Sequence, residues 1–325
     1  MDREALKIDP FVIEASERLA QPAQPPSDDP QIMRERAAAD DAARTEALGI
    51  VPVPVATEEH TVTVPGHPDA RLRVYWPTET RAPEGAGLPV LVYFFGGAFA
   101  IGGIDWVSWD ATFRAYAADA GIIVVAGQYS FAPEVRFPAQ PEQCWSVFEW
   151  AVEHAASLGG DAERMAIGGA SSGGNLAAAV TLMNRDRAHR TIRLQLLENP
   201  SLDLTGDHLD VFLGVPGMMS REEGEAIVRG YLGDDPELTR HPYASPLLAD
   251  AHAELPPAVI YTAELDPLRG DGEAYVRVLT SAGVPAVGIR YLEQTHTSSG
   301  LRGAVEAADH RHRDVVQTLR TLHES

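Results

Sequence analysis

From about residue 58 onward, two kinds of hydrophobic pattern alternate along the chain. Short continuous apolar runs, such as "PVLVYFF" and "GIIVVAGQY", are typical of strands that are buried on both faces of a sheet. Between them lie segments of helical periodicity, such as "PEQCWSVFEWAVEHAASL". Strands alternating with helices predict βαβ units, so we expect an α/β fold with a mostly parallel sheet of about eight strands and helices on both faces.

Two segments interrupt this alternation. Residues 1–55 carry two helical patterns joined by the Pro-rich stretch "QPAQPPSDDP", and residues 203–240 are irregular. Ligands bind at the carboxyl ends of the strands in open α/β sheets. We therefore expect residues 56–202 and 241–325 to form the main domain. Residues 1–55 would supply N-terminal cap helices, and residues 203–240 a cap insertion over the same edge.

Charge and composition exclude several partners. The chain of 325 residues has 47 acidic and 26 basic residues, a formal net charge of −21. Such a charge repels nucleic acid and anionic membranes, so we expect neither as a partner. The start of the chain, "MDREALKIDPFVIEASERLA", is charged and has no long apolar core. We expect no secretory signal, no membrane span and a cytoplasmic location. The single cysteine, Cys144, lies on the apolar side of a helical pattern and is expected to be a buried structural thiol.

A candidate nucleophile lies in "GGASSGG". Gly169 to Gly173 fits the pattern G-x-S-x-G with Ser171 at its centre, whereas the frame centred on Ser172 lacks the leading glycine. An apolar strand pattern precedes the motif and a helix of small residues follows it, which is the setting of a nucleophile elbow. The alternative is a tight packing turn without chemistry. We favour Ser171 as the nucleophile, with the helix N-terminus behind it directed at developing negative charge.

A serine nucleophile needs a base and a group that orients the base. His296 follows the last strand pattern, "PAVGIRYLE", in the loop "QTHTSSG". Three acids, Glu264, Asp266 and Asp271, follow the preceding strand pattern. Asp266 stands just past the strand end, whereas Glu264 is expected within the strand and Asp271 at the cap of the next helix. We therefore expect a triad of Ser171, His296 and Asp266.

An oxyanion hole is predicted beside the triad. The glycines in "VYFFGGAFAIGG" come directly after a buried strand and let backbone N–H groups approach a ligand oxygen. We expect the backbone N–H groups of Gly96, Gly97 and Ser172 to form the hole. In this interpretation Ser171 attacks, and Ser172 contributes its backbone.

At this point the sequence resembles the hormone-sensitive-lipase-like family of α/β-hydrolases, the bacterial carboxylesterases. The resemblance runs from about residue 85 to the end of the chain and rests on "YFFGGAF", "YSFAPEVRFPA", "GGASSGGNLAAAV", "YASPLLA", "LPPAVIYTAELDPLRGDGEAY" and the His296 loop. It implies an α/β-hydrolase fold with a helical cap, and hydrolysis of short- to medium-chain acyl esters without a metal or cofactor. The oligomeric state stays open between a monomer and a homodimer.

The chain departs from the family pattern at three places. Phe95 stands where the oxyanion motif usually has histidine, the elbow has Ala170 and Ser172 in place of aspartate and alanine, and "LLENP" replaces an apolar-Tyr-Pro run. The last change puts Glu198 and Asn199 near the predicted pocket, which suggests a polar or unusual substrate. Other candidates for the pocket wall are Phe95, Trp106, Trp109, Phe212, Met218 and Met219.

Together these features predict a serine carboxylesterase that acts on a small-molecule ester through an acyl-enzyme. Two alternatives remain open. One is a lactone, amide or dehydration reaction on a specialised metabolite, and the other is a small-molecule-binding protein on a hydrolase scaffold.

Overall fold

The computed structural model describes residues 7–20, 27–209 and 219–324. In these residues the strands are β1 (Thr57–Val62), β2 (Ala70–Tyr75), β3 (Leu88–Phe94), β4 (Ile123–Gln128), β5 (Gly160–Ala170), β6 (Leu194–Glu198), β7 (Ala258–Ala263) and β8 (Ala286–Tyr291). They form one eight-stranded sheet in the order β1-β2-β4-β3-β5-β6-β7-β8. β2 pairs antiparallel with β1 and β4, and every other pair is parallel. The predicted α/β class with a mostly parallel sheet is confirmed.

The central strands are apolar along their whole length because both faces of the sheet are covered. All five residues of β6 are buried, as are six of the seven residues of β3. The outer strand β1 instead alternates between exposed and half-buried positions. The continuous apolar runs of the sequence therefore mark the centre of the sheet, as the physics of a doubly covered sheet requires.

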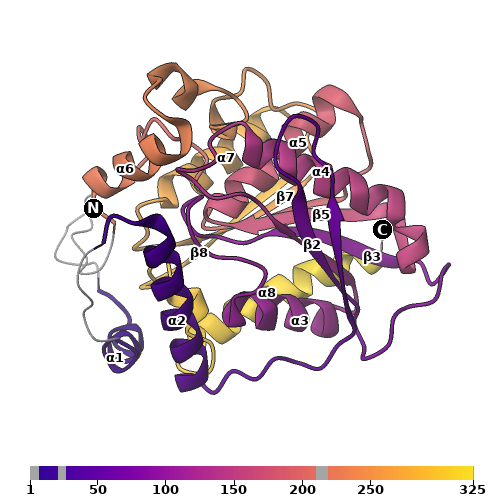
Figure 1. The fold of residues 1–325 in the computed structure, drawn as a ribbon, viewed down its shortest axis with the longest axis horizontal. Helices are drawn as coiled ribbons and strands as arrows, with labels where there is room; N and C mark the ends of the chain where they lie inside the picture. Colours follow the sequence, from indigo (N-terminus) through magenta and orange to yellow (C-terminus); the bar gives the residue numbers. More distant parts are fainter. Residues whose placement is uncertain (1–6, 21–26, 210–218, 325) are drawn as a thin grey trace.

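Helices cover both faces of the sheet. The helices are α1 (Pro10–Arg18), α2 (Pro30–Ala47), α3 (Val107–Ala120), α4 (Ala139–His154), α5 (Ser172–Arg187), α6 (Arg221–Leu232), α7 (Arg269–Ser281) and α8 (Glu306–Arg320). Short 3-10 helices span Ala156–Leu158, Pro236–Arg240, Pro246–Leu248, Ser298–Gly300 and Thr321–His323. Figure 1 shows α4, α5 and α7 on one face and α3 and α8 on the other. Cys144 of α4 is buried, as the sequence predicted.

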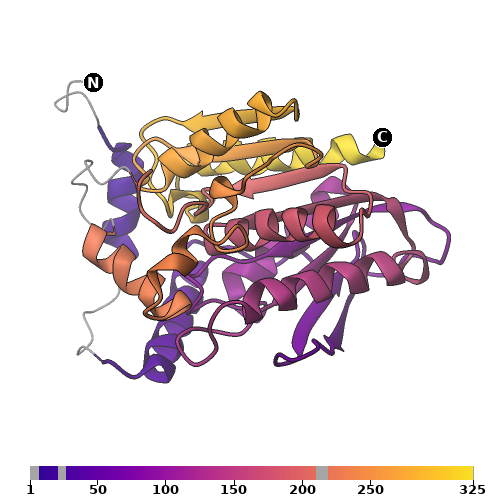
Figure 2. The same ribbon diagram turned by 90° about the horizontal axis from the view of Figure 1, so that it is seen from above.

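Three helices lie together at one end of the molecule. Figure 2 shows α1 and α2 (indigo) and α6 (orange) at this end. Each has a sequence signal for its start: Asp9 and Asp29 accept backbone N–H groups before the prolines that begin α1 and α2, and Ser220 forms a capping box with Glu223 at α6. In the described part of the chain, no helix combines the length and the apolar character needed to cross a membrane.

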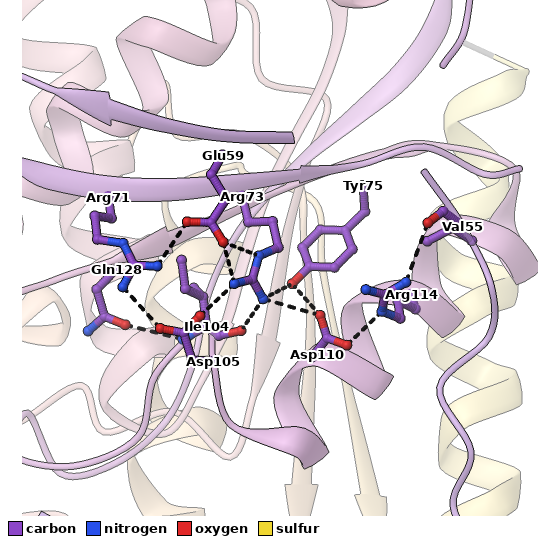
Figure 3. A network of polar contacts seen from close by, with 10 residues as sticks. All are labelled: Val55, Glu59, Arg71, Arg73, Tyr75, Ile104, Asp105, Asp110, Arg114 and Gln128. Carbon is purple, nitrogen blue, oxygen red and sulfur yellow. Dashed lines mark hydrogen bonds and ion pairs between the residues drawn. The ribbon is translucent and has the colours of Figure 1, made fainter. Parts of the chain in front are cut away.

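A polar network fixes the antiparallel edge of the sheet to α3 (Figure 3). Arg73 of β2 donates to Glu59 of β1 and to the Ile104 carbonyl, at 3.0 and 2.9 Å, and it also forms an ion pair with Asp105. The hydroxyl of Tyr75 donates to Asp110 of α3 at 3.1 Å. This network joins three elements through one arginine whose side chain is 14% exposed.

Candidate active site

Ser171 lies at the sharp turn between β5 and α5. Its backbone has φ 52° and ψ −117°, a strained conformation for a residue with a side chain. Two backbone hydrogen bonds stabilise the turn. The Ser171 N–H donates to the Glu198 carbonyl at 2.9 Å, and the Ser171 carbonyl accepts the N–H of Asn175 at 3.1 Å. The strain is therefore supported by the adjacent strand β6 and by the first turn of α5.

The glycines on either side of Ser171 are required by space. A Cβ atom on Gly169 would lie 2.2 Å from the Gly173 carbonyl oxygen, and one on Gly173 would lie 2.1 Å from the Phe94 carbonyl oxygen. Because no real Cβ contact is this short, neither position accepts a larger residue. The motif G-x-S-x-G is thus a steric consequence of the turn.

Three loops bring Ser171, His296 and Asp266 together. The Nε2 atom of His296 lies 3.1 Å from Ser171 Oγ, and its Nδ1 atom lies 2.7 Å from Asp266 Oδ2. The other oxygen, Asp266 Oδ1, accepts the backbone N–H of Leu268 at 2.9 Å. Asp266 is fully buried, whereas the His296 side chain keeps 31% of its surface exposed. With its proton on Nδ1 directed to the carboxylate, His296 presents a lone pair on Nε2 to Ser171.

The electrostatics of the loop raise the pKa of His296. Burial lowers this pKa, but the Asp266 carboxylate raises it by more through its charge and its hydrogen bond, and Arg311 lowers it. The net direction is upward from the ordinary value. The imidazolium form is therefore stabilised beside Asp266, as general base catalysis by a histidine requires.

The loop after β3 approaches the serine pair. A Cβ atom on Gly96 would lie 3.2 Å from Ser171 Cβ, so the backbone of Gly96 borders the candidate nucleophile. The Gly97 N–H donates to Ser172 Oγ at 3.1 Å. Ser172 Oγ also lies 3.3 Å from the hydroxyl of Tyr129, which donates to the Phe95 carbonyl at 3.0 Å. Buried hydroxyls thus fix this loop.

Phe95 lies elsewhere than the sequence predicted. Among the described residues, those that line the cavity over Ser171 do not include Phe95, and its side chain is fully buried. Its ring stacks on Tyr129 with centroids 4.4 Å apart and lies under Gly102 of the same loop. The expectation that Phe95 lines the substrate pocket is therefore wrong. The ring supports the loop by packing, because it continues the buried face of β3.

Glu198 and Asn199 do line the cavity, but neither side chain is free. Glu198 Oε1 accepts the hydroxyls of Tyr93 and Tyr116 at 2.7 and 2.9 Å. Asn199 donates from Nδ2 to the His296 carbonyl at 2.8 Å. Arg311 of α8 contacts both side chains. The sequence predicted two polar groups near the pocket, and in the structure both side chains bind other protein groups.

The sequence analysis did not identify Arg311, although its place in an apolar stripe marks it as a buried charge that needs a partner. The buried face of α8 consists of Ala308, Arg311, Val315, Val316 and Leu319. An arginine in the apolar stripe of an amphipathic helix needs a partner, and only the fold shows that the partners are Glu198 and Asn199.

Asp271 also differs from its predicted role. It is fully buried in the first turn of α7, and its Oδ2 accepts the N–H groups of Leu202 and Asp203 at 2.7 and 3.0 Å. The expectation of a cap for α7 is wrong, since the carboxyl binds the chain that follows β6. Glu264 lies just past the end of β7 rather than within it.

A cavity of about 1530 Å³ opens over Ser171. Its lining includes Trp106 and Trp109 at the start of α3, Ile13 of α1, Arg44 of α2, and Met219 and Arg240 on either side of α6. Phe212 and Met218, two of the predicted wall residues, lie outside the described residues. Within the described ranges, no group of three or more His, Cys, Asp or Glu side chains is placed to hold a metal ion.

Comparison with known proteins agrees with this geometry. The family model described as alpha/beta hydrolase fold matches residues 91–299. The chain belongs to this family, in its hormone-sensitive-lipase-like group, so the predicted family and the prediction of a hydrolytic enzyme are confirmed.

Among its relatives is the carboxylesterase NlhH of Mycobacterium tuberculosis, 38% identical over 232 residues that cover 70% of each chain. The arylesterase of Saccharolobus solfataricus is 33% identical and covers 70% of this chain and 72% of its own. Among solved structures, the hyperthermophilic esterase of the archaeon Pyrobaculum calidifontis superposes with a TM-score of 0.87 at 30% identity. That superposition covers 98% of this chain and all of the other.

Proposed function

We propose that this protein is a serine carboxylesterase whose catalytic residues are Ser171, His296 and Asp266. The observation that carries the proposal is the unbroken chain of hydrogen bonds from Ser171 Oγ through His296 to buried Asp266, at the floor of a cavity. Its relatives' printed names, carboxylesterase and arylesterase, agree with that activity.

The mechanism follows from the positions of the atoms. His296 Nε2 takes the proton of Ser171 Oγ as the oxygen attacks the ester carbonyl carbon. When the tetrahedral intermediate collapses, the C–O bond to the alcohol breaks and His296 gives its proton to the leaving oxygen. Water, deprotonated by His296, then attacks the acyl carbon; as the bond from the acyl carbon to Ser171 Oγ breaks, His296 returns the proton to Ser171 Oγ and the acid is released. Asp266 keeps the proton of the imidazole on Nδ1 and stabilises the imidazolium.

The oxyanion is assigned to backbone N–H groups of Gly96, Gly97 and Ser172. Gly96 borders Ser171, and Ser172 begins α5, whose N-terminus favours negative charge. The Gly97 N–H donates to Ser172 Oγ, so the oxyanion must share or replace this hydrogen bond. Loss of one such donor typically costs about 10²–10³ in turnover.

The substrate is assigned to the class of small esters. The described parts of residues 1–55 and 203–240 form the cap in this proposal, because Ile13, Arg44 and Arg240 line the same cavity as Ser171. A cavity of about 1530 Å³ has room for short- and medium-chain acyl groups and for larger specialised esters.

The test is hydrolysis of p-nitrophenyl esters from acetate to decanoate by the wild type and by Ser171→Ala. We expect turnover by the wild type and its loss in the variant, with unchanged thermal unfolding. The chain-length optimum then measures the usable length of the pocket. Turnover that survives in Ser171→Ala would contradict the mechanism, and an inactive wild type would favour a binding protein on a hydrolase scaffold.

A further inference from the structure

A buried polar chain runs from the sheet to the backbone of the catalytic histidine loop. Arg311 Nε lies 3.4 Å from Glu198 Oε2, and Arg311 Nη1 donates to Asn199 Oδ1 at 3.1 Å. Asn199 Nδ2 in turn donates to the His296 carbonyl at 2.8 Å. We propose that Arg311 and Asn199 are positioning residues for His296, which hold its loop against the sheet and set its electrostatic environment. This inference rests on the proposed role of His296 as the base.

Several hydrogen bonds fix Glu198, at the sheet end of this polar chain. Glu198 accepts the hydroxyls of Tyr93 and Tyr116, and the Glu198 carbonyl accepts the N–H of Ser171. The same residue therefore anchors the nucleophile turn through its backbone and Arg311 through its carboxylate. Glu198 of β6 is thus connected to Ser171 directly and to the His296 loop through Arg311 and Asn199.

Asn199 is suited to this position by its backbone. Its φ is 44°, in the left-handed region that asparagine tolerates better than most residues with a side chain. Its N–H donates to the Tyr261 carbonyl of β7 at 2.8 Å, so the residue is fixed between two strands while its amide reaches the His296 loop. The side-chain amide of asparagine can accept a hydrogen bond from Arg311 and donate one to a carbonyl at the same time. Glutamine carries the same amide on a longer side chain.

The ion pair between Arg311 and Glu198 is buried. The side chains of Arg311 and Glu198 are only 5% and 8% exposed. Arg311 also lies over the rings of Tyr261 and Tyr291, each 5.8 Å from the guanidinium. An ion pair of this kind rarely adds net stability over apolar residues, and the best-attested use of buried polar groups is to fix one geometry. A role in geometry therefore explains the pair better than a role in stability.

The charges that face His296 come from two elements. They are Asp266 after β7, which raises the pKa of His296, and Arg311 of α8, which lowers it. Glu198 faces Arg311 from β6, and Asp271 of α7 interacts with Asp266. Removing the Arg311 cation while keeping Asp266 therefore shifts the pKa of His296 upward.

Two variants test the proposal. Glu198→Gln/Arg311→Met removes both charges together but keeps an oxygen for the two tyrosine hydroxyls, so no buried charge is left unpaired. Asn199→Gly keeps the positive φ and deletes only the amide. Matched controls are Arg73→Met, which removes an arginine of a polar network whose partners do not line the cavity, and Asn184→Ala. Asn184 is likewise buried and bridges the backbone of Arg190.

The readouts are kcat and KM for a p-nitrophenyl ester, and titration of the His296 imidazole by NMR in each full-length protein. We expect kcat to fall about tenfold or more in both test variants with KM within about twofold, because small displacements of a base cost large factors in rate. The controls lose thermal stability but keep kcat. In the double variant we expect the pKa of His296 to rise.

The proposal is overturned if kcat in the test variants matches that of the controls, or if the double variant leaves the titration of His296 unchanged. Because NMR reads His296 without turnover, a wild type that hydrolyses no ester would refute the proposed function and still leave the positioning role open to this measurement.

Discussion

At the scale of single residues, two adjacent serines have different environments. Ser171 has a positive φ, and its Oγ lies within hydrogen-bond distance of His296 at the floor of the cavity. Ser172 is 1% exposed, and its Oγ accepts the Gly97 N–H and lies beside the Tyr129 hydroxyl. The first serine is placed to react, and the second is placed to hold the loop after β3.

Ser172→Ala should therefore have a small effect. It removes one hydrogen bond to the Gly97 N–H but keeps the backbone N–H of residue 172 for the oxyanion. A net hydrogen bond is worth about 1 kcal/mol, so we expect kcat/KM to fall by less than about tenfold. Steady-state kinetics of Ser172→Ala and Ser171→Ala, measured together, test this expectation. Equal losses of kcat/KM in the two variants would mean that the nucleophile is misassigned.

Asp266→Asn should have a large effect. The amide can still accept the Leu268 N–H, but it no longer holds the proton of His296 on Nδ1, and by analogy with other triads kcat falls on the order of 10⁴. Because the Asp266 carboxylate raises the pKa of His296, its loss lowers that pKa. The acidic limb of the residual kcat/KM profile should move to lower pH. A limb that stays in place or moves upward would show that Asp266 does not govern His296.

At the scale of elements, α7 is fixed to the chain after β6 by one buried carboxyl. The pKa of Asp271 is raised to about 8, mainly by burial; the neighbouring carboxylates Asp203 and Asp266 also raise it, and hydrogen bonds from two backbone N–H groups lower it. The folded protein thus retains this proton up to about pH 8, whereas the unfolded chain releases it near pH 4. Stability contributed by this group is complete below about pH 4 and is lost as the pH rises toward 8.

Asp271→Asn should remove the loss of stability that the wild type undergoes as the pH rises. The amide oxygen keeps the hydrogen bonds to Leu202 and Asp203, and the side chain stays neutral at every pH. We expect the Tm of the variant minus that of the wild type to increase from pH 5 to pH 8, because only the wild type loses stability over this range. Asp271→Ala is the control, because it loses the acceptor and should be destabilised across the range. A constant or shrinking margin for Asp271→Asn would contradict the assignment.

Most elements could be predicted because their signals are local. The strand β3 is a continuous apolar run, and the turn at Ser171 needs glycines that the sequence shows. Contacts between distant segments could not be predicted in the same way. Nothing local pairs Arg311 with Glu198, 113 positions away along the numbering, or tells that Phe95 packs on Tyr129. The partners that buried polar groups find in distant segments could therefore be identified only from the fold.

At the scale of the whole molecule, the net charge of −21 opposes folding by self-repulsion. Local networks offset part of this repulsion, as Arg73 does where Glu59, Asp105 and Asp110 converge on it. The balance between the general repulsion and these ion pairs sets the response to salt.

Raising NaCl from about 10 mM to about 150 mM should raise the Tm by a few degrees. The Debye length shortens from about 30 Å to about 8 Å, which screens the long-range repulsion more than contacts at hydrogen-bond distance. Differential scanning calorimetry at fixed pH measures this change. A fall in Tm would mean that the ion pairs outweigh the repulsion.

The central claim is that Ser171 is the nucleophile of a serine esterase. The most direct test is to inactivate the wild type with a p-nitrophenyl alkylphosphonate, which leaves a stable adduct on an activated serine, and to locate the adduct by tandem mass spectrometry. We expect one adduct per chain, on Ser171, formed in step with the loss of ester turnover and absent from His296→Ala. An adduct on Ser172, or an active enzyme that stays unlabelled while it is inhibited, would contradict it.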